Sequence, residues 1–217
     1  MYRGLALGTA LLLAAGMPAT AATVAEGVFG ANLLADVHQP TVFHYRFEMQ
    51  GDGIDPPYVS PVEMDVREVG PDGDKSVYFD LFTGKDRRQF GPMVAREQNP
   101  LILVLLQRDV SQMAQLTGGA SGYFQQQIRH AFNDPAESTP VEIELKDRKV
   151  QGTRLVMRPF ERDPHLERFP QFKEKAYEFV VADDVPGGLY QLVTRVPDAK
   201  DGHLILQESV TFEEAKP

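Results

Sequence analysis

The sequence predicts an α+β fold of mostly antiparallel β-strands, arranged as two meanders on either side of a central helical hairpin. Apolar and polar residues alternate between positions 41 and 81, the spacing of apolar residues becomes helical after Asn99, and alternation returns between positions 141 and 212. The expected chain order is therefore strands, two helices and strands, with residues 41–217 forming a single domain.

The first meander follows from the alternation around Phe43, Tyr45 and Phe47, which is typical of a half-buried strand. Residues 51–57 are expected to form a loop, because aspartates, glycines and two consecutive prolines interrupt the pattern there. Further strands are expected around 62–66 and 77–81, with a turn at 70–73 between them. The second meander is expected within 141–157, 177–181, 189–196 and 204–212.

The helical hairpin is predicted from its end signals. Asn99 suits an N-cap, Pro100 suits the first helical position and Gly118 suits a helix end, so the first helix should span about 100–116. Ser121 is the expected cap of a second helix that ends near residue 132. Residues 101–106 are apolar on all sides of the first helix, which must therefore be covered on more than one side. Enclosure between two sheets is favoured, and an apolar groove for a lipid, an acyl chain or a partner helix is the alternative.

The N-terminal residues 1–21 have the order of a cleavable signal peptide. Arg3 precedes an apolar run, and Ala19 and Ala21 supply small residues before a cleavage site at Ala22. The run from 5 to 15 is shorter than the ~20 residues that span a bilayer, so stable membrane insertion is not expected after cleavage. The chain is thus predicted to be exported to the periplasm in soluble form. Residues 22–40 lack a clear periodicity and are expected to be a loosely ordered leading segment.

Composition excludes several kinds of function. The chain has 31 acidic and 22 basic residues and a net charge of -9, which argues against binding nucleic acid. It has no cysteine, which excludes a thiol nucleophile, a thiolate metal site and a haem attached through cysteine. The five histidines are widely spaced, so no metal site is expected, and no motif indicates a cofactor.

Recognisable catalytic motifs are missing from the sequence, which favours a non-catalytic binding or assembly protein whose partner is an unknown protein or a small apolar ligand. One alternative is a carrier that encloses an apolar ligand between sheet and hairpin. Its candidate ligand-binding residues are Phe43, Tyr45, Phe47, Leu101 and Leu105. Another alternative is a hydrolase whose site is assembled from the scattered residues His44, Glu48, Asp80 and Arg87.

Overall fold

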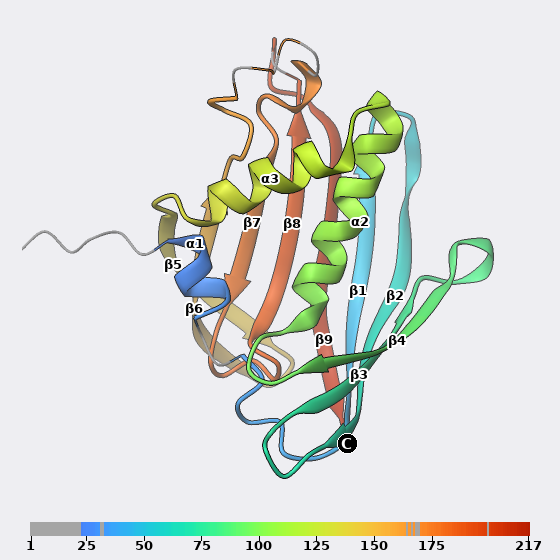
Figure 1. Cartoon of the computed structure of the whole chain (residues 1–217), viewed down its shortest axis with the longest axis vertical. Coiled ribbons are helices and arrows are strands. Elements are labelled where there is room, and N and C mark those ends of the chain that lie inside the picture. The colour runs from blue at the N-terminus through green and yellow to red at the C-terminus, as the bar shows by residue number, and fades with distance from the viewer. Residues whose placement is uncertain (1–22, 31–32, 164, 166, 168–169, 199) are drawn as a thin grey trace, which may run out of the picture.

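A computed structural model describes residues 23–30, 33–163, 165, 167, 170–198 and 200–217, and it contains one nine-stranded antiparallel sheet with helices over one face (Figure 1). The predicted signal peptide lies outside the described residues. The strands are β1 (Thr41–Gly51), β2 (Ile54–Val69), β3 (Lys75–Leu81), β4 (Arg88–Ala95), β5 (Glu137–Leu145), β6 (Arg148–Met157), β7 (Ala176–Val181), β8 (Leu189–Pro197) and β9 (Leu204–Lys216). The helices are α1 (Val24–Val28), α2 (Pro100–Thr117) and α3 (Ser121–Phe132), with short 3-10 turns η1 (Gly84–Asp86) and η3 (Pro170–Phe172).

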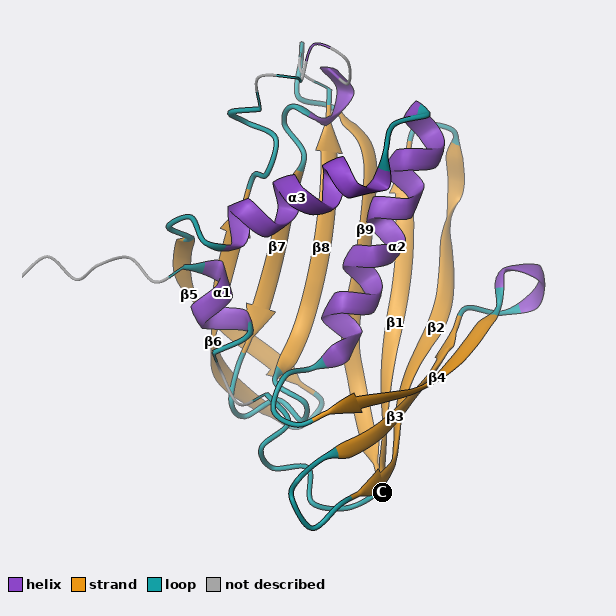
Figure 2. Cartoon of the chain, viewed as in Figure 1, coloured by secondary structure: helices purple, strands orange, loops and turns teal. Residues whose placement is uncertain are grey.

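The strand order is β4-β3-β2-β1-β9-β8-β7-β6-β5, so the first and last strands pair in the middle of the sheet. This pairing joins the two predicted meanders, and the predicted α+β fold class is confirmed. The expectation that two sheets enclose the hairpin is wrong, because all nine strands belong to one sheet and α2 and α3 both lie over the same face (Figure 2). None of the described helices combines the length and the apolar character that crossing a bilayer requires.

Alternation in β1 divides its side chains between the two faces of the sheet. Phe43, Tyr45 and Phe47 are at most 1% exposed and point toward the helices, while Arg46 between them is exposed on the opposite face. The strand prediction for this segment is therefore confirmed. The sheet has one apolar face under the helices and one polar face.

The loop predicted at 51–57 is wrong from Ile54 onward, because β2 begins at that residue and includes Pro56 and Pro57. Pairing explains how the strand tolerates them. β2 pairs with β3 only from Val62, so residues 54–60 have a neighbouring strand, β1, on one side alone. A proline that lacks an N–H is acceptable where no ladder bond is needed.

The end signals of α2 work as predicted. The Asn99 side chain accepts a hydrogen bond from the Leu101 N–H at 3.1 Å, and Gly118 ends the helix with a φ of 66°. The predicted cap of α3 is wrong, because Ala120 is the N-cap and Ser121 lies inside the first turn. The predicted apolar stripe of α2 is buried, and consists of Ile102, Leu105, Leu106, Val110 and Met113.

Within the leading segment, residues 23–30 and 33–37 include side chains that pack in the core. Thr23 and Glu26 form a reciprocal capping box at the start of α1, with bonds of 3.1 and 2.8 Å. Val24, Val28 and Leu34 are completely buried. This segment therefore contributes apolar side chains to the core, which the missing periodicity of so short a helix does not reveal.

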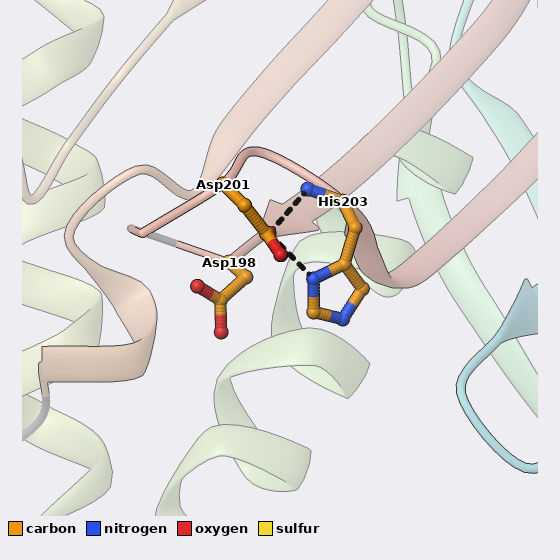
Figure 3. A group of neighbouring side chains, drawn as sticks. All are labelled: Asp198, Asp201 and His203. Atoms are coloured by element: carbon orange, nitrogen blue, oxygen red, sulfur yellow. Dashed lines mark hydrogen bonds and ion pairs between the residues drawn. The ribbon is translucent and has the colours of Figure 1, made fainter.

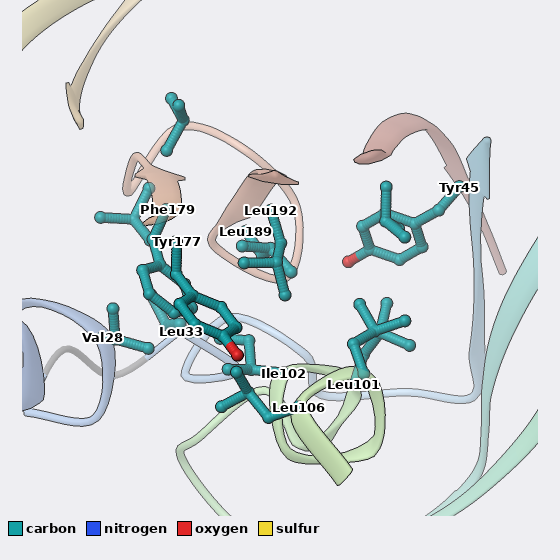
Figure 4. Packing of buried hydrophobic residues seen from close by; sticks show 14 of the residues in the cluster. Val28, Leu33, Tyr45, Leu101, Ile102, Leu106, Tyr177, Phe179, Leu189 and Leu192 are labelled. Carbon is teal, nitrogen blue, oxygen red and sulfur yellow. The ribbon is translucent and has the colours of Figure 1, made fainter. Parts of the chain in front are cut away.

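The core lies between the apolar face of the sheet and the helices. Figure 4 shows Tyr177, Phe179 and Leu192 of β7 and β8 close to Ile102 and Leu106 of α2. Val28 of α1 and Leu33 reach the same cluster. Packing against these groups fixes where α2 lies on the sheet, and hence where the spaces beside α2 are.

Candidate functional site

Two ion pairs at neighbouring positions fasten α2 to the sheet, the first part-buried and the second buried. Arg108 donates to both carboxylate oxygens of Glu208 on β9, at 2.6 and 3.1 Å. Asp109 accepts from Lys175 Nζ at 2.8 Å and from the hydroxyl of Tyr177. Burial and the nearby Asp109 carboxylate raise the pKa of Tyr177 well above its usual value of 10, so the hydroxyl keeps the proton that it donates. These contacts hold the middle of α2 against β7 and β9.

A cavity of about 750 Å³, called cavity A, opens between α2 and the strands β1 to β4. The sheet contributes an apolar wall formed by Phe47, Met49, Leu81 and Phe82. α2 contributes a polar wall formed by Arg108, Ser111, Gln112 and Gln115, whose spacing places them on one face of the helix. These polar residues of the hairpin therefore face an internal space as well as solvent.

A second cavity of about 710 Å³, called cavity B, lies between α2, α3, α1 and β4. Its walls are mainly apolar and include Phe29, Met93, Leu103, Val110, Ile128 and Phe132. Leu103 is 49% exposed although it is a large apolar residue. The side of α2 that the single sheet leaves uncovered therefore faces cavity B.

Cavities A and B adjoin, because Phe90 of β4 and Val104 and Gln107 of α2 line both of them. Phe90 is 40% exposed at this junction. Each cavity lies within the range of about 300–1,000 Å³ that is usual for sites of small molecules. Together they form one mainly apolar space that passes beside α2, with most of its polar groups at the cavity A end.

The five candidate ligand-binding residues all lie in the buried interior, and Phe47 is the one of them that lines cavity A. Leu105 contacts a much smaller space of about 20 Å³ beneath α2, which Phe47 also lines. Phe43, Tyr45 and Leu101 line neither cavity A nor cavity B and pack in the core. Ligand contact by these five residues stays a prediction.

Sequence reasoning missed the residues of β4 and β2 that line the cavities. Phe90 and Met93 flank Gly91-Pro92, a pair that indicates a turn rather than a strand, and Tyr58 follows the two prolines of β2. The sequence did contain a signal for Leu103, because this residue belongs to the run 101–106 that is apolar on all sides of the helix. That pattern pointed to a second covering surface without identifying it.

Two residues on the walls of cavity A each carry a buried polar atom that has no hydrogen-bond partner. These atoms are the hydroxyl oxygen of Tyr58, on the sheet side, and Oε1 of Gln112, on the helix side. Within the described part of the chain no other side-chain oxygen or nitrogen is in this condition. Buried polar atoms are usually satisfied, and an unsatisfied one lowers the stability of the fold by about 1–3 kcal/mol.

The four residues of the hydrolase alternative lie on the polar face of the sheet, and each has a charged side chain beside it. His44 lies 3.3 Å from Glu63, and Glu48 accepts from Arg46 at 2.8 Å. Arg87, helped by Gln89, bonds to Asp80 and lowers the pKa of that carboxyl. Such pairs are ordinary on a solvated sheet face, and they supply no catalytic arrangement.

His203 forms a separate cluster with aspartates at the turn between β8 and β9. Ligand atoms of Asp198, Asp201 and His203 lie within 4.8 Å of one another (Figure 3), and His203 Nε2 is 3.0 Å from Asp52 in the turn between β1 and β2. Hydrogen bonds to Asp201 and Asp52 raise the pKa of His203 from 6.5 to about 9. At neutral pH the ring is protonated, and its ion pairs with Asp201 and Asp52 link the two turns.

No family model matches the chain, and no curated protein matches it. Among the solved structures that are similar to the chain, three match over most of their length. A LolA superfamily protein from Nitrosomonas europaea is 12% identical, with a TM-score of 0.25 and coverage of 90% of this chain and 94% of that one. LprF from Mycobacterium bovis is 10% identical, with a TM-score of 0.29 and coverage of 91% and 95%.

The third structure is described as an outer membrane lipoprotein-sorting protein domain from Vibrio parahaemolyticus. It is 6% identical, with a TM-score of 0.25 and coverage of 82% of this chain and 85% of that one.

Proposed function

We propose that the chain is an exported, non-catalytic carrier of an apolar ligand, which binds beside α2 in cavities A and B. The observation that carries the proposal is the pair of adjoining, mainly apolar cavities, which share Phe90, Val104 and Gln107. The partly exposed side chains of Phe90 and Leu103 lie on the walls. A ligand that covered them would remove apolar surface from water, which is favourable by roughly 25 cal/mol per Å².

Export is supported by residues 1–21, which have the charge, length and small-residue pattern of a signal peptide. A carrier in the periplasm would need a soluble mature chain that begins at or near Ala22. The intact mass of the protein recovered from the periplasmic fraction tests this. Recovery of a longer chain in the membrane fraction would contradict it.

Two leucines of α2 provide a matched test of the binding site. Leu103 and Leu116 are 49% and 67% exposed, but only Leu103 lines cavity B. Leu103→Glu places a carboxylate against the ligand's hydrocarbon and should weaken binding of an uncharged fluorescent acyl ester by about tenfold or more. Leu116→Glu introduces the same charge on the same helix away from both cavities, and should leave that affinity within about twofold.

Titration of the purified mature protein and both variants distinguishes the outcomes. The proposal fails if the wild type does not bind the probe saturably. The hypothesis of a non-catalytic binding or assembly protein whose partner is another protein would then be favoured. It also fails if both glutamates weaken binding equally, because binding would then reflect surface charge rather than the cavity.

A further inference from the structure

The walls of cavities A and B differ in chemistry. Cavity B is lined chiefly by apolar side chains such as Met93, Val110 and Ile128, although Arg129 also lies on its wall. Cavity A sets an apolar sheet wall against a polar face of α2. A plain hydrocarbon would match cavity B. In cavity A the same hydrocarbon would displace water from the polar wall without offering a hydrogen bond in its place. The difference indicates a ligand with two unlike ends.

The two unpartnered buried atoms both belong to residues that line the polar end of this space. Gln112 Oε1 can only accept a hydrogen bond, and the Tyr58 hydroxyl can donate or accept. Neighbouring polar groups are already engaged, since the Ser111 hydroxyl donates to the Gln107 carbonyl at 2.8 Å and Gln107 Oε1 accepts from Gln125 at 2.7 Å. The bonds missing from cavity A are therefore those of Tyr58 and Gln112.

The formal charges around cavity A cancel when Glu208, the partner of Arg108, is counted. Arg108 is bound by both oxygens of Glu208, whose side chain is only 6% exposed. Arg88 donates to the backbone carbonyls of Lys85 and Arg87, and Asp86 lines the same cavity. An acidic head would also bring oxygens that cannot donate to Gln112 Oε1. An uncharged group that both donates and accepts fits better, and a hydroxyl is the simplest of these.

We infer that the carried ligand is an amphiphile whose uncharged, hydroxyl-bearing head bonds to Tyr58 and Gln112 in cavity A while its hydrocarbon chain passes Phe90 and Val104 into cavity B. The inference rests on the proposed function and names the ligand class for the same site. Tyr58 and Gln112 recognise the head of the ligand, and its hydrocarbon begins where cavities A and B meet.

Three compounds with the same acyl chain separate head recognition from chain binding. Glycerol monolaurate has free hydroxyls, methyl laurate is the same kind of ester without them, and laurate has a charged head. Calorimetric titration of the mature protein, below the aggregation limit of each compound, should show glycerol monolaurate binding about tenfold tighter than methyl laurate, as expected for two modest hydrogen bonds. Laurate should also bind more weakly than glycerol monolaurate.

Tyr58→Phe and Gln112→Met should each reduce the preference for glycerol monolaurate over methyl laurate by about threefold, with methyl laurate affinity unchanged. Tyr78→Phe, on β3 and outside both cavities, is the matched control and should keep the full preference. Because Tyr58→Phe and Gln112→Met remove unsatisfied buried atoms, the melting temperature of the unliganded protein should not fall. A purely structural role for these groups would lower it.

The outcomes separate two failures. If none of the three compounds binds, the carrier proposal itself fails. If all bind with equal affinity, or if laurate binds tightest, the carrier proposal stands and the assignment of an uncharged hydroxyl-bearing head is overturned. The assignment is also overturned if Tyr58→Phe and Gln112→Met leave the preference unchanged.

Discussion

Removing the Asp109 carboxylate should destabilise the protein strongly, because Lys175 would keep a buried positive charge without its partner. The two side chains are only 6% and 3% exposed, and their N–O distance is 2.8 Å. Breaking a buried pair in this way lowers stability by about 3–5 kcal/mol, a large part of the roughly 5–15 kcal/mol that stabilises a typical domain. Asp109→Leu should therefore shift the urea unfolding midpoint far below that of the wild type.

Two comparisons make this prediction specific. Asp109→Leu combined with Lys175→Met and Tyr177→Phe removes every member of the network, and should recover most of the lost free energy. Asp74→Ala breaks the exposed pair with Arg96 and should change the free energy of unfolding by less than about 1 kcal/mol. The reasoning is refuted if Asp109→Leu destabilises no more than Asp74→Ala, or if the triple variant is no more stable than Asp109→Leu.

The remaining predictions concern β1 and the His203 cluster. Phe47→Asp buries an unpaired carboxylate and should unfold the domain. Arg46→Ala, on the exposed face, should change the free energy of unfolding by less than about 1 kcal/mol. Equal melting temperatures for the two variants would show that β1 faces the other way. The raised pKa of His203 means that its ion pairs stabilise the fold fully below about pH 6.5 and lose this effect as pH rises through about 9. His203→Gln should remove that part of the pH dependence of urea unfolding, and an unchanged pH profile would exclude the linkage.

Local signals predicted much of the fold. The Asn99-Pro100 start and the Gly118 end of α2 depend on backbone groups within a few residues, so the sequence alone reveals them. Alternation likewise revealed the strand around Phe43, and the turn residues 185–188 helped to locate the strand around Phe179. The prolines of β2 led to the wrong prediction of a loop. The strand can contain them because β3 pairs with β2 only from Val62, and this pairing is a feature of the tertiary structure that the local sequence does not reveal.

The site was harder to predict than the fold, because its walls come from segments far apart in the chain. Tyr58 and Gln112 lie in different elements, and nothing near either residue indicates that both face one cavity. The apolar run 101–106 did indicate that α2 needs a second covering surface. Which of its residues stays uncovered depends on the single sheet, and Leu103 is partly exposed for that reason.

The central claim is that a hydrocarbon chain occupies the space where cavities A and B meet. Methyl-labelled NMR of the mature protein, titrated with glycerol monolaurate, tests it at named positions. The methyl signals of Val104 and Leu103, which line the cavities, should shift saturably, while those of the exposed Leu116 and Val59 should stay in place. Saturable shifts centred on Leu116 or Val59, or no saturable shift at Val104, would contradict the account.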